Sequence, residues 1–438
     1  MNSASMTTLA GILQAEADKL LACVHCGLCL SACPTYLLAG DENDSPRGRL
    51  YLMRAVAEGR LSVDQPAFRR HIDLCLGCRA CETVCPSGVL YGRVLEAARA
   101  EIALRPMTPP DPATRLIRFA LAHLFVSPRR LHLFFAPARW LRRSTLARII
   151  IESRLLPARW EKALSLLLAT APIEGDRSLR SSGARHDQRV EAPSSSRPVA
   201  FFAGCVGREL FEHTNRATHR VLQAHGCTVT DPPDQVCCGA LHAHAGDLDN
   251  ARRLARKNIT VFEATGTVPI IVNVAGCGAM MKEYGHLLSG DPDFHTRARA
   301  FAARVRDISE YLIEIGFRPG PQPVEATVTY DAPCHLHHAQ KVMRAPIELL
   351  RQLPGIRFVP LPEAEMCCGS AGIYNLLHPD WADAILQRKL EHIRRTGADI
   401  LVTGNAGCLM HITSGLRRAG MTTRVMHPIE LIAQTYPE

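Results

Sequence analysis

The sequence contains few aromatic residues and no long uninterrupted apolar run. Phe, Trp and Tyr make up only 5% of its 438 residues, which argues against the aromatic platforms on which single-stranded nucleic acids stack. The longest stretch without a charged residue, 264–281, is at the length limit of a transmembrane helix but contains a proline and three glycines. It predicts a strand, a turn and the start of a helix instead of a membrane span.

An export signal and the signatures of organic cofactors are missing too. Glu16, Asp18 and Lys19 interrupt the region where a signal peptide needs an apolar core, so we expect a cytoplasmic protein with reduced thiols. No GxxxxGK[ST] phosphate loop occurs, and a dinucleotide-like loop at Gly276 has Met281 in place of its third glycine. We therefore expect neither flavin nor nicotinamide in this chain.

Cysteine, in contrast, is abundant, with 17 residues. Many cysteines in a reducing compartment indicate metal or redox chemistry, because disulfides do not persist there. Eight of them lie between Cys23 and Cys85, and nine lie between Cys205 and Cys408. The cysteine-free segment between these blocks divides the chain into two chemically distinct halves.

The first block contains two copies of the run C-x2-C-x2-C-x3-C-P, which is the spacing of two-cluster ferredoxins. Three thiolates on one tight loop can reach different irons of one cluster, whereas the fourth, next to proline, points across to the other cluster. Structural zinc also uses CxxC pairs, but two complete runs with both prolines argue against it. The spacing therefore predicts two [4Fe-4S] clusters. The expected ligands are Cys23, Cys26, Cys29 and Cys85 for cluster 1, and Cys75, Cys78, Cys81 and Cys33 for cluster 2.

The second half repeats itself at an interval of 129 to 131 residues. In each copy a β-rich run leads to the first cysteine and a second leads to the last, and helical stretches such as 249–264 and 381–396 lie between them. This alternation predicts two α/β units with small, largely parallel sheets. Cys227 has no counterpart and stays unassigned. The matched landmarks are Cys205, Cys237-Cys238-Gly239 and Cys277 in the first copy, and Cys334, Cys367-Cys368-Gly369 and Cys408 in the second.

These repeats resemble the cysteine-rich CCG domain of heterodisulfide reductases and of several respiratory dehydrogenase subunits. That family pattern ends each copy in CxxC, but here Met280 and His411 stand at the last position, so the five-thiolate cluster of heterodisulfide reductases is not expected. Three interpretations remain open: further iron-sulfur clusters, a cluster-free thiol or quinone site, or a structural scaffold. The histidines near these cysteines are expected to be ordinary polar residues, with donation to a quinone or iron ligation as the alternative. They are His242, His244, His335, His337, His338 and His411.

The segment between the two halves is strongly basic. From Arg105 to Lys162 there are twelve Lys or Arg against three acidic residues, which accounts for the whole net charge of +9. Apolar clusters alternate with these arginines, as in amphipathic helices that lie on anionic bilayers. The alternative is a helical bridge with solvated arginines. The arginines concerned are Arg118, Arg129, Arg130, Arg139, Arg142 and Arg143.

The fold class that follows is multi-domain. We expect an α-helical two-cluster ferredoxin module, a helical basic connector, a flexible linker rich in Ser, Arg and Pro, and two α/β CCG repeats. Helices are expected over 46–59 and 89–104. The expected boundaries are 1–104 for the module, 105–171 for the connector, 172–198 for the linker, and 199–318 and 324–438 for the repeats.

Taken together, these parts resemble the iron-sulfur subunit of glycolate oxidase (glycolate dehydrogenase) over nearly the whole chain. The ferredoxin part alone is shared with glycerol-3-phosphate and lactate-utilisation subunits, and the KEYG and HAQK stretches narrow the choice. The motifs are Ala22-Cys-Val-His-Cys-Gly27, Cys33-Pro-Thr-Tyr36, Pro46-Arg-Gly-Arg49, Cys85-Pro-Ser-Gly88, Gly276-Cys-Gly278, Lys282-Glu-Tyr-Gly285, Cys334-His335, His338-Ala-Gln-Lys341 and Cys367-Cys-Gly-Ser-Ala-Gly372.

The resemblance implies an electron relay. FAD-containing partner subunits would oxidise glycolate to glyoxylate, and this chain would receive the electrons and pass them towards quinone, with no catalytic residue of its own. The complex would work on the cytoplasmic side of the inner membrane, either free of the membrane or in peripheral contact with it, and without nucleic acid. The rival interpretations are a disulfide- or heterodisulfide-reducing subunit and a lactate-utilisation subunit.

Overall fold

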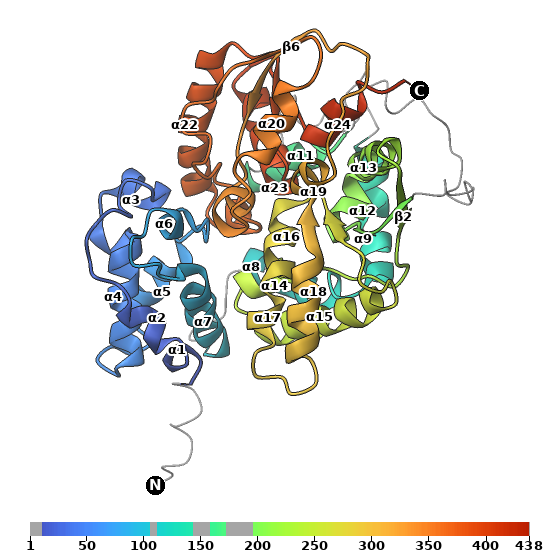
Figure 1. The fold of residues 1–438 in the computed structure, drawn as a ribbon. Coiled ribbons are helices and arrows are strands. Elements are labelled where there is room, and N and C mark those ends of the chain that lie inside the picture. The colour runs from blue at the N-terminus through green and yellow to red at the C-terminus, as the bar shows by residue number, and fades with distance from the viewer. Residues whose placement is uncertain (1–10, 106–111, 143–157, 172–195, 438) are drawn as a thin grey trace.

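The structure, a computed structural model, describes residues 11–105, 112–142, 158–171 and 196–437. Figure 1 shows a helical N-terminal module on one side and two α/β repeats that lie against each other, with connector helices beside them. The expected multi-domain fold class, with a helical module followed by two repeats built on parallel sheets, is confirmed.

The N-terminal module consists of short helices because prolines and glycines start and stop them. Pro34, Pro46 and Pro66 each occupy a first position of a helix, where the missing N–H costs nothing. The Ser45 side chain accepts a hydrogen bond from the Gly48 backbone N–H (2.9 Å) and caps the helix expected over 46–59. The elements are α1 (Gly11–Gln14), α2 (Ala17–Leu21), α3 (Pro34–Ala39), η1 (Glu42–Asp44), α4 (Pro46–Ala57), α5 (Pro66–Asp73), α6 (Ala80–Thr83) and α7 (Tyr91–Leu104).

The first repeat is built on a four-stranded parallel sheet in the order β2-β1-β3-β4. The run 264–281 is a strand and the start of a helix, as expected. The strand β1 begins at Arg197, inside the expected linker, whose residues 172–195 lie outside the described residues. The elements are β1 (Arg197–Phe202), α12 (Cys205–Leu210), α13 (Glu212–Ala224), β2 (Cys227–Thr230), α14 (Ala240–His244), α15 (Leu248–Glu263), β3 (Ile270–Val272), α16 (Ala275–Lys282), α17 (Tyr284–Leu287), α18 (His295–Arg304), β4 (Val305–Asp307) and α19 (Ile308–Glu314).

The second repeat has the same topology, with the strand order β6-β5-β7-β8 and parallel pairing throughout. Its first cysteine is followed by a single π-helical turn, η3 (His335–Ala339), where the first repeat has the α-helix α12. The other elements are β5 (Ala326–Tyr330), α20 (Ala345–Arg351), β6 (Ile356–Phe358), α21 (Tyr374–Leu377), α22 (Pro379–Thr396), β7 (Ile400–Val402), α23 (Ala406–Arg418), β8 (Arg424–Met426) and α24 (Pro428–Ala433).

The two repeats share one hydrophobic core. The last helix of each repeat packs on the first long helix of the other, α24 on α13 and α19 on α20, so the contact is reciprocal. Phe201 and Ile271 of the first repeat lie in the same buried cluster as Val328 and Val402 of the second. Burial of this shared apolar surface fixes the two repeats relative to each other.

The connector helices cover the repeats as α8 (Pro112–His123), α9 (Pro128–Leu141) and α11 (Ala158–Leu168). The expectation that its arginines share one solvent-facing role is wrong for two of them. Arg139 pairs with the buried carboxylate of Glu209, and buried Arg142 donates to the Thr170 and Leu210 carbonyls (3.1 and 2.6 Å). Arg118, Arg129 and Arg130 are exposed, and Arg143 lies outside the described residues. No helix in the described ranges is both long and apolar enough to cross a membrane.

Candidate metal centres

Two loops of the module present cysteines with the same backbone conformation. His25 and Gly27 in one loop, and Gly77 and Arg79 in the other, lie two and four residues after the first cysteine, and all four have positive φ. Alternation between right- and left-handed residues turns successive N–H groups towards a common centre and makes an anion-binding concavity. His25 and Arg79 adopt this conformation without being glycine, at a cost of about 1–2 kcal/mol each.

The first cysteine group consists of Cys23, Cys26, Cys29 and Cys85. These four side chains line one small cavity near the surface together with Pro86 and Tyr91. Cys26 is exposed, and burial raises the pKa of the half-buried Cys29. Cys85 comes from the far end of the second run, so the cavity joins the two loops.

The second cysteine group consists of Cys33, Cys75, Cys78 and Cys81, and it is more deeply buried. Burial raises the pKa of Cys81 well above its ordinary value, and the neighbouring sulfurs of Cys78, Cys75 and Cys33 add to the increase. The structure thus brings Cys33 to the loop of the other run.

Hydrogen-bond donors surround the second cysteine group. The Tyr91 hydroxyl and the Gly77 backbone N–H donate to Cys75 Sγ (3.5 and 3.4 Å), and Thr35 Oγ1 lies 3.3 Å from Cys33 Sγ. The sequence analysis missed these residues, because nothing in their spacing marks them as neighbours of sulfur.

Arg49 lies beside the second cysteine group. Its guanidinium is fully buried, lies 4.0 Å from Cys33 Sγ, and pairs with Asp44 Oδ1 at 3.0 Å. His71 contacts the same Asp44 oxygen at 3.0 Å, which gives this histidine a structural partner away from the sulfurs. Arg49 belongs to the PRGR stretch, so its motif was visible in the sequence although its role was not.

The third cysteine group consists of Cys205, Cys237, Cys238 and Cys277 in the first repeat. Cys205 Sγ lies 3.4 Å from Cys237 Sγ, and Cys238 is in hydrogen-bond contact with Cys277. The hydrogen bond to Cys237, together with burial, raises the pKa of Cys205 well above its ordinary value. Gly239, at φ +89°, makes the turn after the cysteine pair, and a Cβ there would lie 3.2 Å from the backbone of Ala251.

The fourth cysteine group consists of Cys334, Cys367, Cys368 and Cys408 in the second repeat, and all four are buried. Cys368 Sγ lies 3.4 Å from Cys408 Sγ, and Cys334 is in contact with Cys367. Asn405 Nδ2 donates to Cys408 Sγ (3.5 Å), and His335 Nδ1 lies 3.5 Å from Cys334 Sγ. Gly369 turns the chain as Gly239 does, with φ +90°.

These groups suit iron-sulfur clusters chemically. All 17 cysteines are free thiols, and thiolates are the soft ligands that such clusters select. Four thiols per group match the number that one [4Fe-4S] cluster binds as thiolates, and such binding releases the thiol protons. The remaining cysteine, Cys227, lies apart from the groups in β2, where it packs in the core and contacts the Tyr311 hydroxyl.

The second and fourth cysteine groups meet at the boundary between the module and the second repeat. Leu76 and Cys78 pack in one cluster with Cys334, Cys367 and Tyr374. Burial raises the pKa of Cys78 well above its ordinary value, and the nearby Cys367 thiol adds to the increase. The Thr83 hydroxyl and His338 Nδ1, 2.8 Å apart, close the same boundary.

Ion pairs join the module to the first repeat. Glu283 pairs with Arg79 (3.2 Å) and Arg93 (2.8 Å), and Arg99 donates to the His244 carbonyl (3.1 Å). Among the described residues, the buried cluster that holds the third cysteine group contains no cysteine of the module, whereas a cluster with two cysteines of the fourth group includes Cys78.

The histidines near the repeats have different surroundings. His338 contacts the Glu365 carbonyl (3.1 Å) besides Thr83, and His242 Nε2 contacts the Leu121 carbonyl of α8 (2.9 Å). His411 lies 3.4 Å from the Ala382 carbonyl. The Nε2 of His335, like the Nδ1 of His242 and of His411, is inaccessible to solvent and has no hydrogen-bond partner in the described structure.

Comparison with known proteins agrees with these features. A 4Fe-4S dicluster domain matches residues 19–89, and a cysteine-rich domain matches residues 199–282 and 328–413. The chain is 38% identical to the probable glycolate oxidase iron-sulfur subunit of Bacillus subtilis, over 96% of this chain and 94% of that one. It is 35% identical to the glycolate oxidase iron-sulfur subunit of Escherichia coli, over 96% and 95%. Lactate utilization protein A of Oceanobacillus iheyensis is 33% identical over 53% of this chain and 96% of its own.

Proposed function

Because this chain belongs to the family of glycolate oxidase iron-sulfur subunits, we propose that it relays electrons from an FAD-containing partner subunit, where glycolate is oxidised, to a quinone. The first and second cysteine groups each hold one [4Fe-4S] cluster in this proposal. Iron-sulfur clusters, when bound, accept and pass on single electrons. The chain divides as the sequence suggests, with the module over 1–104, the connector over 105–171, the linker over 172–198, and the repeats over 199–318 and 324–438.

The observation that carries the proposal is the contact between Cys78 and the fourth cysteine group. A relay requires redox groups in close succession, and Cys78 belongs to one group while packing against the next. The side chains of Leu76 and Tyr374 exclude water from this boundary. We extend the proposal to at least one further cluster in the repeats, with the fourth cysteine group as the better candidate, since it adjoins the module.

A cysteine exchange in the complete complex tests the relay. In Cys78→Ser, glycolate should still reduce the partner's flavin, but electrons should no longer reach quinone. Cys227→Ser is the matched control, because Cys227 is a buried thiol outside all four groups, and its iron content should equal that of the unaltered protein. Quinone reduction by Cys78→Ser at the unaltered rate would contradict the proposal.

The relatives carry two different substrates in their names, since lactate utilization protein A matches 53% of this chain as well. Substrate choice belongs to the partner subunit in this proposal. Steady-state oxidation of glycolate and lactate by the purified complex separates the two, and preference for lactate would assign the complex to the second class.

The proposal also places the chain on the cytoplasmic face of the inner membrane, and the exposed face of α8 and α9 supports this. Every charged side chain of α8 and α9 is an arginine, and large apolar side chains beside them face solvent. Tryptophan and other aromatic residues beside basic ones suit the bilayer interface. Each basic residue near an anionic surface contributes about 1 kcal/mol. The face consists of Arg115, Leu116, Arg118, Phe119, Arg129, Arg130, Leu133, Phe134 and Trp140.

Sedimentation with anionic lipid vesicles at rising salt tests this face. Replacing Arg115, Arg118, Arg129 and Arg130 by Gln should abolish the salt-sensitive binding. Arg142 is left in place because it is buried. The control removes the same charge from paired, exposed arginines elsewhere, Arg54, Arg216, Arg297 and Arg395, and should sediment like the unaltered protein. Equal sedimentation of both variants would contradict the membrane assignment.

A further inference from the structure

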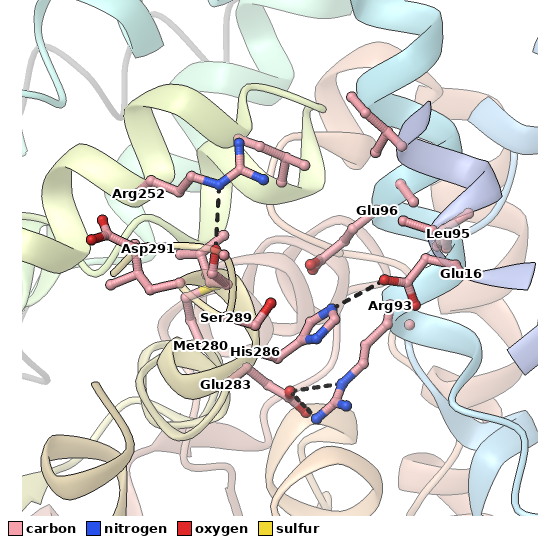
Figure 2. Close-up of a pocket in the computed structure, with 18 of the residues that line it drawn as sticks. Glu16, Arg93, Leu95, Glu96, Arg252, Met280, Glu283, His286, Ser289 and Asp291 are labelled. Atoms are coloured by element: carbon pink, nitrogen blue, oxygen red, sulfur yellow. Dashed lines mark hydrogen bonds and ion pairs between the residues drawn. The ribbon is translucent and has the colours of Figure 1, made fainter. Parts of the chain in front are cut away.

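A cavity of about 870 Å³ lies between the module and the first repeat. Figure 2 shows α7 residues Leu95 and Glu96 on one side and Met280, Glu283 and His286 on the other. This volume is in the range of pockets that bind small organic molecules. Neither the sequence nor the proposed relay assigns it a role.

Several charged or polar groups on the walls of the cavity pair with one another. Arg93 pairs with Glu283 at 2.8 Å, and His286 lies 3.6 Å from Glu16 (Figure 2). The wall arginines Arg79, Arg93, Arg252 and Arg256 are all paired with carboxylates, which disfavours an anionic ligand. Two more such pairs are Arg256 with Asp291 (2.6 Å) and His244 with Glu96 (3.2 Å).

Between these pairs the walls are apolar. Leu95 and Met280 are almost fully buried, and Leu248 and Leu287 are partly buried. Flat apolar surface of this kind stabilises a ring system by removing it from water. The ligand is thus expected to combine an apolar body with few polar atoms.

His335 supplies the unsatisfied polar group. It lines the cavity, and its Nε2 is buried without a partner in the described structure. Its other ring nitrogen faces Cys334 Sγ at 3.5 Å, and the His244 ring lies 5.3 Å away. An unpaired buried nitrogen is unfavourable, and a ligand carbonyl oxygen would satisfy it by accepting its hydrogen bond.

The cavity borders three of the four cysteine groups. Gly77 and Arg79, on either side of Cys78, line it, as does Gly276, which precedes Cys277. His335 follows Cys334. A ligand here would lie next to redox groups of the module and of both repeats, which is unusual for a structural void and suits an electron acceptor.

The cavity also lies near the connector helix α8. The α14 residue His242 contacts the Leu121 carbonyl of α8, and His244 at the end of α14 lines the cavity.

We propose that this cavity binds the headgroup of the quinone, with one quinone carbonyl accepting a hydrogen bond from His335. The inference rests on the proposed function. Glycolate loses two electrons and two protons on becoming glyoxylate at the partner. The quinone takes two electrons delivered through this chain, and two protons from water, to become the quinol. Glycolate and quinone are thereby converted to glyoxylate and quinol with atoms and electrons in balance.

The experiment uses the complete complex, decylubiquinone as the acceptor, and an azido derivative of it for photolabelling. Label is expected on peptides that contain 91–97, 244–256 or 279–294. Leu248→Trp fills the cavity at a residue that is distant in sequence from any cysteine of the four groups, and should suppress labelling. It should also raise the KM for decylubiquinone on the order of tenfold, as expected for about 1.4 kcal/mol of lost binding.

Two histidine variants separate the hydrogen bond from general damage. His335→Phe replaces the imidazole by a phenyl ring and so removes both nitrogens. It should weaken quinone binding, as Leu248→Trp should. His337→Phe alters a half-exposed histidine two residues away that does not line the cavity, and should label like the unaltered protein. Iron content of each variant reports whether the protein has folded with its metal.

Labelling outside the cavity, or unaltered labelling of Leu248→Trp, would overturn this inference while leaving the relay intact. Failure of the proposed function gives a different result, because the unaltered complex would then oxidise glycolate with a soluble dye but reduce no quinone. Loss of iron in Leu248→Trp would mean that its effect is indirect, and photolabelling of the unaltered protein then decides the inference alone.

Discussion

The two CCG repeats have the same strand order and the same four-thiol arrangement but differ beneath their cysteine pairs. The helix that packs on the CCG glycine contacts it through Ala251 in the first repeat and Ala382 in the second. Seven residues later stand Asn258 and Lys389, both buried. Asn258 donates to the Cys237 carbonyl (3.0 Å), whereas Lys389 pairs with Asp331 at 2.9 Å. One repeat thus supports its cysteines with a neutral amide and the other with an ion pair.

The repeats also differ in how they meet the module. The second repeat packs its cysteines against Leu76 and Cys78, and the first repeat uses the ion pairs of Glu283. Duplication of a fold therefore preserved the thiol scaffold while the surroundings changed. In the proposed relay, only the second repeat is placed to exchange electrons with the module directly.

Removing one thiol from either repeat should affect electron transfer most strongly, and by a different amount in the two repeats. Mutation of residues outside a metal's direct ligands costs roughly 10- to 100-fold, so loss of a direct ligand in Cys367→Ser should slow quinone reduction by more than that. Cys237→Ser, the matched change in the first repeat, should have the smaller effect. The measurement is single-turnover oxidation of the reduced flavin by quinone, and a larger effect in Cys237→Ser would reverse the assignment.

The buried ion pair should dominate stability differences between the repeats. Burial alone would lower the pKa of Lys389, but the Asp331 carboxylate raises it above its ordinary value. Lys389→Met leaves that carboxylate buried and unpaired, which should cost about 3–5 kcal/mol. Asn258→Leu should cost only about 1–3 kcal/mol, the loss of an amide's hydrogen bonds. Chemical denaturation measures both, and the double variant Lys389→Met with Asp331→Leu should recover part of the loss.

The residues that cap the last helix of each repeat should make the stability of the protein depend on pH in opposite directions. Both α19 and α24 begin with a capping box, at Asp307 and His427. Burial lowers the pKa of His427 to about 4, so its unfolded form binds more protons and stability is lost as pH falls from about 6.5 to about 4, by up to about 3 kcal/mol. Burial raises the pKa of Asp307 to about 6. The folded protein therefore binds more protons than the unfolded chain, and stability is lost as pH rises from about 4 to about 6.

Single variants separate these two contributions. His427→Gln should flatten the loss of stability in acid, and Asp307→Asn should flatten the loss towards neutral pH. Denaturation midpoints measured between pH 4 and pH 7 give both slopes. Equal slopes in the two variants and the unaltered protein would show that neither cap titrates in this range.

The smallest expected effect concerns the boundary between the module and the first repeat. Burial favours the neutral form of Glu283, but Arg79 and Arg93 hold its pKa below the ordinary value. The stabilisation is therefore present at neutral pH and is lost as pH falls through the lowered pKa. Glu283→Gln should weaken the boundary by about 1 kcal/mol at neutral pH. Faster hydrogen exchange in α7, with unchanged exchange around Leu76, would support this, and faster exchange at both boundaries would not.

The elements that the sequence predicted are those set by local pattern. The strands that lead to Cys205 and Cys334 follow from short β-rich runs, and the helices over 249–264 and 381–396 follow from apolar periodicity. The duplication was visible because cysteine pairs are rare and their spacing is regular. Each cluster-binding run is similarly local, since one tight turn carries three of the four cysteines expected for its cluster.

What could not be predicted depends on contacts between distant segments. Cys78 packs against the cluster that contains Cys367, 289 residues further along the chain, and no periodicity in the sequence reports such proximity. Arg142 looked like its exposed neighbours in composition, yet the helix turns it towards the Leu210 carbonyl. Lys389 lies in a helix whose other basic residues are exposed, and only the carboxylate of Asp331 explains its burial.

The central claim, that the module's second cysteine group packs against the cysteines of the second repeat and not against those of the first, is tested most directly by electron paramagnetic resonance of the reduced chain. Spin coupling between neighbouring clusters should broaden the module's signal in the unaltered protein. Cys367→Ser should remove this broadening, and Cys237→Ser should keep it. Broadening that survives in Cys367→Ser and disappears in Cys237→Ser, or that is absent from the unaltered protein, would contradict the claim.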